Sequence, residues 1–415
     1  MTNRQRTALA EPLACAIRSG QPCGQIKRGL RLCSAFLIAL LLVLSTAGCA
    51  GQATSLATQP PTTVSQAQPT AEPTVTSAAS LATDPSVTPE PSLTAEPTAA
   101  PSETRAIADE QRNFMTGEIL ADPLAPKQRP MAFMINNTKI ATPQIGTSFA
   151  DLIFETEIEG GVTRMLAVFT DVRQVPELGS LRSLRHNFID LAGGLDAIIV
   201  HIGWSYAAEA QVKRQGTNNI NLAVYPSAWW RDDVWWRERG KEHSVKTTSE
   251  RMSAALVKSA LRTELSKTQA PFCAFHDPGV LVPANGEAAG LVTIPFSGYN
   301  TTTLTWEQTA GLYSKGEYGK PQLDLATGEP LQFTNALILL TSITSFEETI
   351  LRQIDLSQGN GFYVSGGRAE PITWRKGGTH DPFFFATATG EPLIINTGKT
   401  YIAIVSLQRT IRFEP

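Results

Sequence analysis

Short apolar runs separated by turn signals begin near Arg129. Several of these runs are apolar enough to be buried on both faces of a sheet, and they predict strands at residues 131–135, 152–157, 165–170 and 197–202. Between them, apolar residues at helical spacing predict helices at residues 183–192, 206–215 and 249–265. Strands that alternate with helices are typical of an α/β layer structure. We therefore predict an α/β N-terminal domain at residues 127–270.

The pattern changes after Pro271, where the helical signal fades. Apolar runs spaced by Gly-, Asn- and Pro-containing turns predict strands at residues 302–306, 336–341, 361–364, 371–374, 383–385, 393–396 and 401–406. We therefore predict that residues 271–415 form a mainly-β (α+β) C-terminal domain.

The N-terminus has the layout of a bacterial lipoprotein signal. Residues 1–31 are rich in arginine, residues 32–44 are apolar, and small residues then precede Cys49. A membrane-spanning helix is the alternative, but a bilayer requires about 20 apolar residues and this run is shorter. We predict that residues 1–48 are a signal peptide and that Cys49 receives a lipid. The protein would then be extracytoplasmic and anchored to the cell membrane.

The next segment has the composition of a tether. Residues 50–104 consist almost wholly of Thr, Ser, Pro, Ala, Gln and Glu, and they contain no Lys or Arg. Such a segment cannot bury enough apolar surface to offset the entropy of ordering the chain. We predict that residues 49–126 are a disordered tether that holds the folded part away from the membrane.

Charge and cysteine content exclude several classes of function. Residues 1–48 hold six of the 35 basic and one of the 38 acidic residues, which leaves 29 against 37, a net charge of −8. That balance argues against nucleic-acid binding. Cys273 is the only cysteine after Cys49, so no internal disulfide is possible. The chain has no zinc-binding cysteine pair, no His-Glu-x-x-His and no Walker loop, and we predict neither a metal nor a cofactor.

Several motifs resemble the YerB-like lipoproteins of bacteria. They are the segments at residues 129–137, 143–146, 150–155, 159–164, 179–185, 201–205, 230–232, 242–244, 374–376 and 396–402. The resemblance covers essentially all of residues 129–406. It implies a lipid-anchored envelope protein with two adjacent domains, both of unknown function, and no established catalytic residue. The chain departs from the family pattern at Leu181, Trp204 and Glu242.

A set of polar residues at predicted strand ends is the first candidate site. Open α/β sheets place ligand crevices at these ends. The set comprises Asn136, Asn137, Asp151, Glu155, Glu159, Arg164, Arg182, Arg185 and His201, with Ser205, Arg231 and His243 from later segments. Arg182 and Arg185 share one face of a helix start, where they would suit a carboxylate or phosphate of a wall polymer. Alternatively, Glu155, Glu159 and Arg164 are structural partners of these arginines.

Ser205 supplies a second candidate. The run Gly203-Trp204-Ser205-Tyr206-Ala207 follows a predicted strand and precedes a predicted helix, as a nucleophile elbow does. Asp232 and His243 follow it in the chain order of α/β-hydrolases. The final glycine of that motif is missing, and a serine at this position is equally suited to cap the helix.

A tryptophan-rich segment is the third candidate. Four of the seven tryptophans lie within residues 229–236, beside arginines and aspartates. Such rings can stack on sugars, but they also cover domain seams and cores.

Three functions follow from these candidates. The leading hypothesis is a non-catalytic, lipid-anchored binding module for an anionic wall ligand or a partner protein. The alternative is an envelope serine hydrolase that acts on peptidoglycan or an ester through Ser205, His243 and Asp232. A third hypothesis is a scaffold whose tryptophan-rich segment docks another envelope protein.

Overall fold

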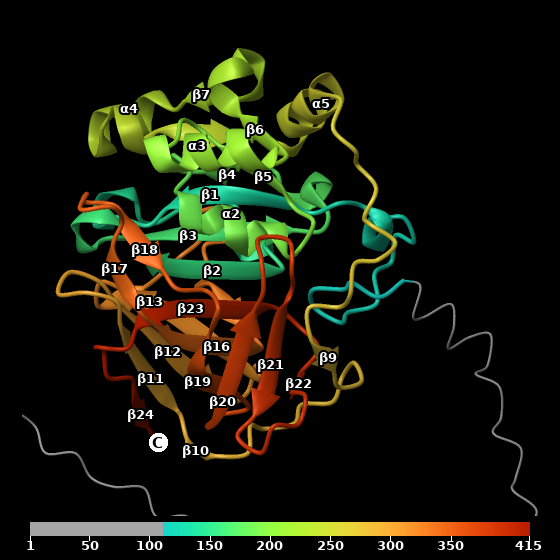
Figure 1. Ribbon diagram of the computed structural model, residues 1–415, viewed down its shortest axis with the longest axis vertical. Helices are drawn as coiled ribbons and strands as arrows, with labels where there is room; N and C mark the ends of the chain where they lie inside the picture. Colours follow the sequence, from blue (N-terminus) through green and yellow to red (C-terminus); the bar gives the residue numbers. More distant parts are fainter. Residues whose placement is uncertain (1–110) are drawn as a thin grey trace, which may run out of the picture. The chain divides into compact units, whose positions relative to one another are not determined.

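The computed structural model describes residues 111–415 (Figure 1). The predicted signal peptide, the lipidated Cys49 and most of the predicted tether lie outside the described residues. Within residues 111–415, no helix has the length and apolar character needed to cross a membrane. No group of three or more His, Cys, Asp or Glu side chains in this part of the chain is arranged to hold a metal ion.

An 11-stranded mixed sheet is the centre of the fold, and both halves of the chain contribute to it. Its order is β10-β20-β19-β16-β23-β2-β3-β1-β5-β6, with β21 paired to β20. The early strands are β1 (Met131–Asn136), β2 (Leu152–Glu157), β3 (Thr163–Phe169), β5 (Ile198–His201) and β6 (Asn219–Asn221). The late strands are β10 (Glu287–Ala288), β16 (Asn335–Thr341), β19 (Gln358–Ser365), β20 (Arg368–Lys376), β21 (Phe383–Thr387) and β23 (Thr400–Ser406).

The two halves meet where β2 pairs with β23. The pairing is parallel and runs from Leu152 opposite Thr400 to Thr156 opposite Ile404. Every residue of β1, β2 and β3 is buried, as the continuous apolar runs predicted. The backbone hydrogen bonds of the sheet therefore continue from one half of the chain into the other.

Helices cover both faces of the early strands. Side chains of α2 (His186–Gly193) and α3 (Tyr206–Gln215), among them Phe188 and Ala208, pack with Met134 on one face. On the other face, Met252 of α5 (Ser249–Ser259) packs with Phe133. The remaining α-helix within residues 111–415 is α4 (Asp233–Arg239), and Figure 1 shows α3, α4 and α5 together at the end of the molecule next to β5 and β6.

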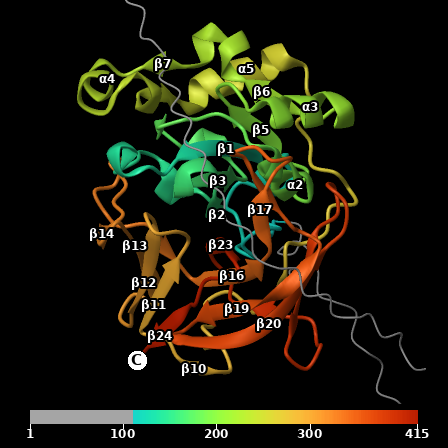
Figure 2. The same cartoon turned by 60° about the vertical axis from the view of Figure 1, so that its left-hand side comes forward.

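A second sheet packs against the late strands. Its order is β14-β13-β12-β11-β24, with β15 paired to β13, and Figures 1 and 2 show it beside β16 and β19. Its strands are β11 (Leu291–Pro295), β12 (Thr301–Glu307), β13 (Leu312–Glu317), β14 (Lys320–Pro321), β15 (Gln332–Phe333) and β24 (Arg412–Glu414). The Phe333 and Tyr401 rings, 5.4 Å apart, join the two sheets in one core.

Three small sheets complete the structure. They pair β4 (Leu178–Gly179) and β7 (Trp230–Arg231) with β8 (Val245–Thr247), β17 (Ile343–Ser345) with β18 (Arg352–Ile354), and β9 (Ala274–Phe275) with β22 (Ile394–Ile395). The described fold is thus richer in strands than in helices.

Candidate functional site

Three arginines gather at the end of β1. Arg164 is the second residue of β3 and lies opposite Asn136, the last residue of β1. Arg182 is held beside the same strand because its amide donates to the carbonyl of Met134. Arg185 is the residue that precedes α2. The strand end therefore brings together side chains that follow Asn136 by 28 or more positions in the sequence.

Arg164 is buried without a counter-charge. Its side chain is 3% exposed, its Nη1 donates to the carbonyl of Ser183 at 2.6 Å, and its Nε has no hydrogen-bond partner. Within residues 111–415, no carboxylate lies at ion-pair distance from it. Burial, followed by the charges of Arg185 and Arg182, holds its pKa well below the usual value, while Glu159 acts in the opposite direction. A guanidinium nevertheless stays protonated in proteins, so the positive charge remains.

Arg182 is partly buried and is likewise left with a free donor. Its Nη1 donates to the carbonyl of Glu242 at 2.8 Å, whereas its Nε has no partner. Burial lowers the pKa of Arg182, and the charges of Arg185 and Arg231 act in the same direction, whereas Glu242 and Glu159 act against them. Arg185 differs, because its Nε lies 2.9 Å from both carboxylate oxygens of Glu159.

His243 joins this cluster from the loop after α4. Its Nδ1 lies 2.7 Å from the Nδ2 of Asn136, which makes that imidazole nitrogen the acceptor. Its Nε2 lies 3.5 Å from Glu242. Burial first, and then the charge of Arg182, lower the pKa of His243. Arg231 is connected to the same loop through its hydrogen bond to the carbonyl of Lys241.

We define the arginine cluster as Arg164, Arg182, Arg185, Arg231 and His243. Glu159 and Glu242 are the carboxylates that act on it, which leaves positive charge in excess. Two buried Nε–H groups are unsatisfied, and buried donors are normally paired. Guanidinium groups bind carboxylates and phosphates through two parallel hydrogen bonds. The arrangement is therefore chemically suited to an anion.

Asn137, Glu155 and Asp151 lie elsewhere, inside the protein. Asn137 donates to Glu155 at 2.7 Å, and Glu155 is fully buried against Lys315 at 3.0 Å. Asp151 accepts from the amide of Thr170 at 2.6 Å, and burial raises the pKa of this carboxyl to about 6. The alternative hypothesis, in which these residues pair with the arginines for structural reasons, therefore holds for Glu159 and Arg185. Glu155 instead pairs with Lys315 from the C-terminal half, and Arg164 has no carboxylate partner within residues 111–415.

Lys315 and Glu317 are charged residues that the sequence analysis missed. Both point inward from β13, and the Nζ of Lys315 lies 2.5 Å from the carboxylate of Glu317. Burial raises the pKa of Glu317 to about 7. The Tyr401 hydroxyl also donates to Glu155, at 2.8 Å. The available signal was the spacing, since residues two apart on a strand share one face.

The three residues of the hydrolase hypothesis have separate partners. The Ser205 hydroxyl accepts from the amide of Ala208 at 3.2 Å and caps α3. Asp232 caps α4 and pairs with Lys246 at 2.9 Å. In the described part of the chain, no hydrogen bond joins Ser205, Asp232 and His243 to one another. His201 is also occupied, with its ring nitrogens 2.7 Å from the carbonyl of Gly203 and 3.1 Å from Asn219.

The tryptophan-rich segment has both buried and exposed rings. Trp235 is buried beneath Arg239 and Lys246, whose charged groups lie 3.9 and 4.0 Å from its ring centre. Trp236 is 45% exposed and lies near Lys241. The segment thus contributes both to the core and to the surface around α4.

Comparisons with known proteins cover most of the described residues. Residues 115–262 match the family described as "Protein of unknown function (DUF3048) N-terminal domain", and residues 292–402 match its C-terminal domain. The protein named "Putative lipoprotein YerB" from Bacillus subtilis (strain 168) is 30% identical over 286 residues, which is 67% of this chain and 82% of that protein. The crystal structure of YerB protein from Bacillus subtilis has a TM-score of 0.65 and 25% identity, and the match covers 73% of this chain and 99% of that one.

Proposed function

This chain belongs to the DUF3048 family, which includes YerB, and from that premise we propose that it is a lipid-anchored envelope protein that binds an anionic ligand. The related protein is named as a lipoprotein, and the sequence around Cys49 has the same kind of signal. The ligand is a carboxylate- or phosphate-bearing component of the wall. Binding, rather than chemical conversion, is the role.

The burial of Arg164 without a carboxylate is the observation that carries this proposal. A buried charge is costly unless it is paired and hydrogen-bonded. A bound anion would supply the missing counter-charge and accept from the free Nε–H groups of Arg164 and Arg182. Arg185 would hold its place through Glu159.

The partners of Ser205 favour binding over hydrolysis. A nucleophilic serine needs a base within hydrogen-bond reach, and the hydroxyl of Ser205 instead accepts from the α3 backbone. Asp232 is held by Lys246 and a helix amide rather than by an imidazole. These side chains have structural roles, so the arginine cluster is the site that supports the proposed function.

Replacing Arg182 tests the binding site. We expect the purified protein to bind inorganic phosphate or a glycerol-phosphate polymer in isothermal titration calorimetry, and Arg182→Ala to weaken that binding about tenfold or more, because a charge-assisted hydrogen bond is lost. Arg409→Ala removes an exposed arginine elsewhere and should leave binding unchanged. A flat titration with phosphate, the polymer and peptidoglycan fragments, or equal binding by Arg182→Ala, would contradict the proposal.

Replacing Cys49 tests the location. Cells that express the full chain should incorporate radiolabelled palmitate into it and retain it in the membrane fraction. Cys49→Ala should abolish both, whereas Cys273→Ala should abolish neither, because the Cys273 side chain lies within the folded part. Recovery of the unlabelled precursor from the cytosol would show that the envelope assignment is wrong.

A further inference from the structure

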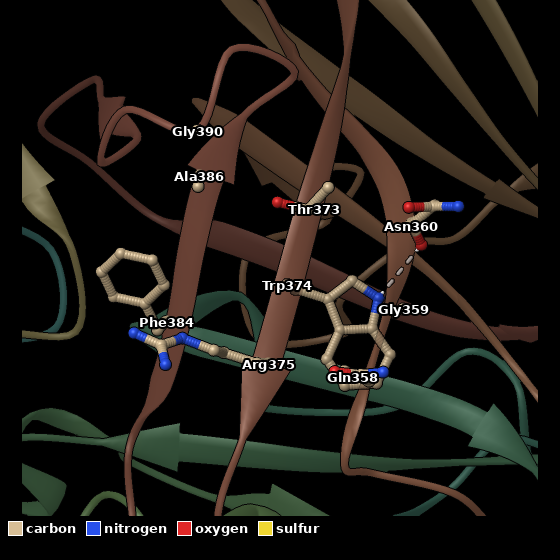
Figure 3. A pocket seen from close by; sticks show the side chains of 9 residues that line it. All are labelled: Gln358, Gly359, Asn360, Thr373, Trp374, Arg375, Phe384, Ala386 and Gly390. Carbon is tan, nitrogen blue, oxygen red and sulfur yellow. Dashed lines mark hydrogen bonds between the residues drawn. The ribbon is translucent and has the colours of Figure 1, made fainter. Parts of the chain in front are cut away.

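A second polar surface lies on the late strands of the central sheet. Here β19, β20 and β21 form a pocket of about 550 Å³. Figure 3 shows the side chains that line it, which are Gln358, Gly359, Asn360, Thr373, Trp374, Arg375, Phe384, Ala386 and Gly390. The volume is within the range of roughly 300–1,000 Å³ that is common for small-molecule sites. None of these residues belongs to the arginine cluster.

The strand register arranges the pocket in two rows. Arg375 of β20 lies opposite Gln358 on one side and Phe384 on the other, and these three form the first row. Thr373 lies opposite Asn360 and Ala386 in the second row. Residues two apart on a strand share a face, so both rows point outward together. The pocket thus has fixed positions for one charge, one ring and several uncharged polar groups.

Arg375 is the charged group of the pocket, and an aromatic ring supports it. Its guanidinium carbon lies 4.4 Å from the centre of the Phe384 ring, and Figure 3 shows the two side chains next to each other. Within residues 111–415, no carboxylate pairs with Arg375 and no hydrogen bond uses its N–H groups. Contact with a ring face leaves the edge of the guanidinium free to donate. That edge fits a carboxylate through two parallel hydrogen bonds.

The remaining polar groups carry no charge. Gln358, Asn360 and Thr373 are exposed, and together their side chains offer amide and hydroxyl donors and acceptors. Two glycines lie among these groups for reasons of backbone packing and conformation. A side chain at Gly359 would point to the opposite face of β19, where it would come within 2.4 Å of the Leu340 carbonyl and 2.8 Å of the Trp374 ring, and Gly390 has a positive φ of 90°. The pocket therefore suits a ligand with one negative charge and several hydroxyl or amide groups.

We propose that this pocket binds a saccharide that carries a single carboxylate. The sugar carboxylate pairs with Arg375, a ring face of the sugar contacts Phe384, and hydroxyl and acetamido groups bond to Gln358, Asn360 and Thr373. A polyanion fits less well, because Arg375 is the one cation among the residues that line the pocket. This site is separate from the arginine cluster and does not depend on the function proposed for it.

Two matched sugars test the proposal. N-acetylmuramic acid has the pyranose ring and acetamido group of N-acetylglucosamine, and it adds one carboxylate. In a titration of the full protein followed by NMR or calorimetry, we expect N-acetylmuramic acid to bind at least fivefold more tightly than N-acetylglucosamine. Arg375→Ala should abolish this preference, and Arg375→Lys, which keeps the charge but loses the planar fork, should reduce it.

Control variants separate this site from the first. Arg409→Ala removes another exposed arginine and should not change the preference between the two sugars. Arg182→Ala alters the arginine cluster, and it should leave unchanged the preference that is measured from the NMR shifts of the residues that line this pocket. Thermal melting of Arg375→Ala should match the wild type, because the side chain is exposed. Equal affinity for both sugars, binding of neither, or loss of the preference in Arg182→Ala in place of Arg375→Ala would overturn the proposal.

Discussion

Arg164 and Lys315 are two buried cations whose surroundings differ. Lys315 is 1% exposed and lies 3.0 Å from Glu155 and 2.5 Å from Glu317, so its charge is fully compensated. Arg164 is 3% exposed and has the carbonyl of Ser183 as its partner. The same fold thus neutralises one buried cation internally and leaves the other with a free donor. This contrast supports the proposal that an anion binds next to Arg164.

Glu317 should make stability depend on pH. Burial raises its pKa from 4.5 to about 7, with Glu155 acting in the same direction and Lys315 against it. The folded state therefore binds this proton more tightly than the unfolded state does. This contribution is largest below pH 4.5 and is lost as the pH rises to 7, by up to about 3 kcal/mol at roughly 1.4 kcal/mol per pKa unit. Denaturant unfolding of the wild type should show that the free energy of unfolding falls between pH 4.5 and 7, and Glu317→Gln should reduce this fall.

The control for this prediction is an exposed acid. Glu391→Gln should leave the slope between pH 4.5 and 7 as it is in the wild type. Asp151, whose pKa burial raises to about 6, contributes a fall of the same sign between pH 3.8 and 6, so Asp151→Asn should flatten only the lower part. An unchanged slope in Glu317→Gln would show that this carboxyl is ionised in the folded protein.

The candidate site could be predicted from the sequence only in part. Arg182 and Arg185 were found from their spacing, and the structure places both near Arg164. Their partners could not be found in this way, because the contact between Arg182 and the Glu242 carbonyl joins positions 60 apart. Lys315 gave no apolar signal on β13, and its burial depends on Glu155 of β2 as well as on Glu317 of its own strand.

At the scale of elements, Ser205 has a measurable structural task. Its hydroxyl satisfies the Ala208 amide in the first turn of α3. Ser205→Ala should lower the free energy of unfolding by about 1 kcal/mol, the usual cost of losing such a cap, and Ser205→Asp should restore most of it. Urea unfolding measures this. Labelling of Ser205 by a fluorophosphonate would instead identify it as a nucleophile.

Local patterns predicted strands better than helix ends. Residues 152–157 and 206–215 coincide with β2 and α3, because apolar periodicity and turn residues mark both. The helix predicted at residues 249–265 ends at Ser259, since Ala260 adopts a left-handed conformation with φ of 54°. The helix predicted at residues 183–192 begins at His186, because the amide of Leu184 donates to the carbonyl of Gly203 and Arg182 bonds to β1. Helix α4 was missed, although Asp232 caps it.

At the scale of the whole molecule, the shared sheet should make unfolding cooperative. Strands β2 and β23 exchange backbone hydrogen bonds along five paired positions, and both are buried. We expect residues 111–415 of the full chain to unfold in one transition. Hydrogen exchange followed by mass spectrometry should give β2 and β23 similar opening free energies across a urea series. Exchange of β23 at much lower urea concentrations than β2 would contradict a single unit.

This pairing lay beyond what the sequence could predict. Leu152 and Thr400 are separated by 248 positions. A parallel pairing between such distant segments is not marked by a turn motif in the sequence. The apolar run at residues 401–406 predicted a buried strand, but many partners would have satisfied it. Long-range order in the sheet is decided by packing on both faces rather than by the strand itself.

The location of β23 also affects when the protein can fold. It lies between β16 and β2 and follows β2 by more than 240 positions in the chain, so the centre of the sheet stays open until β23 has been synthesised. Non-local pairing of this kind delays folding, because the connecting chain must first be brought together. For an exported lipoprotein, such as we propose, that delay keeps the chain unfolded, and able to pass through a translocation pore, until β23 is available to pair with β2 and β16.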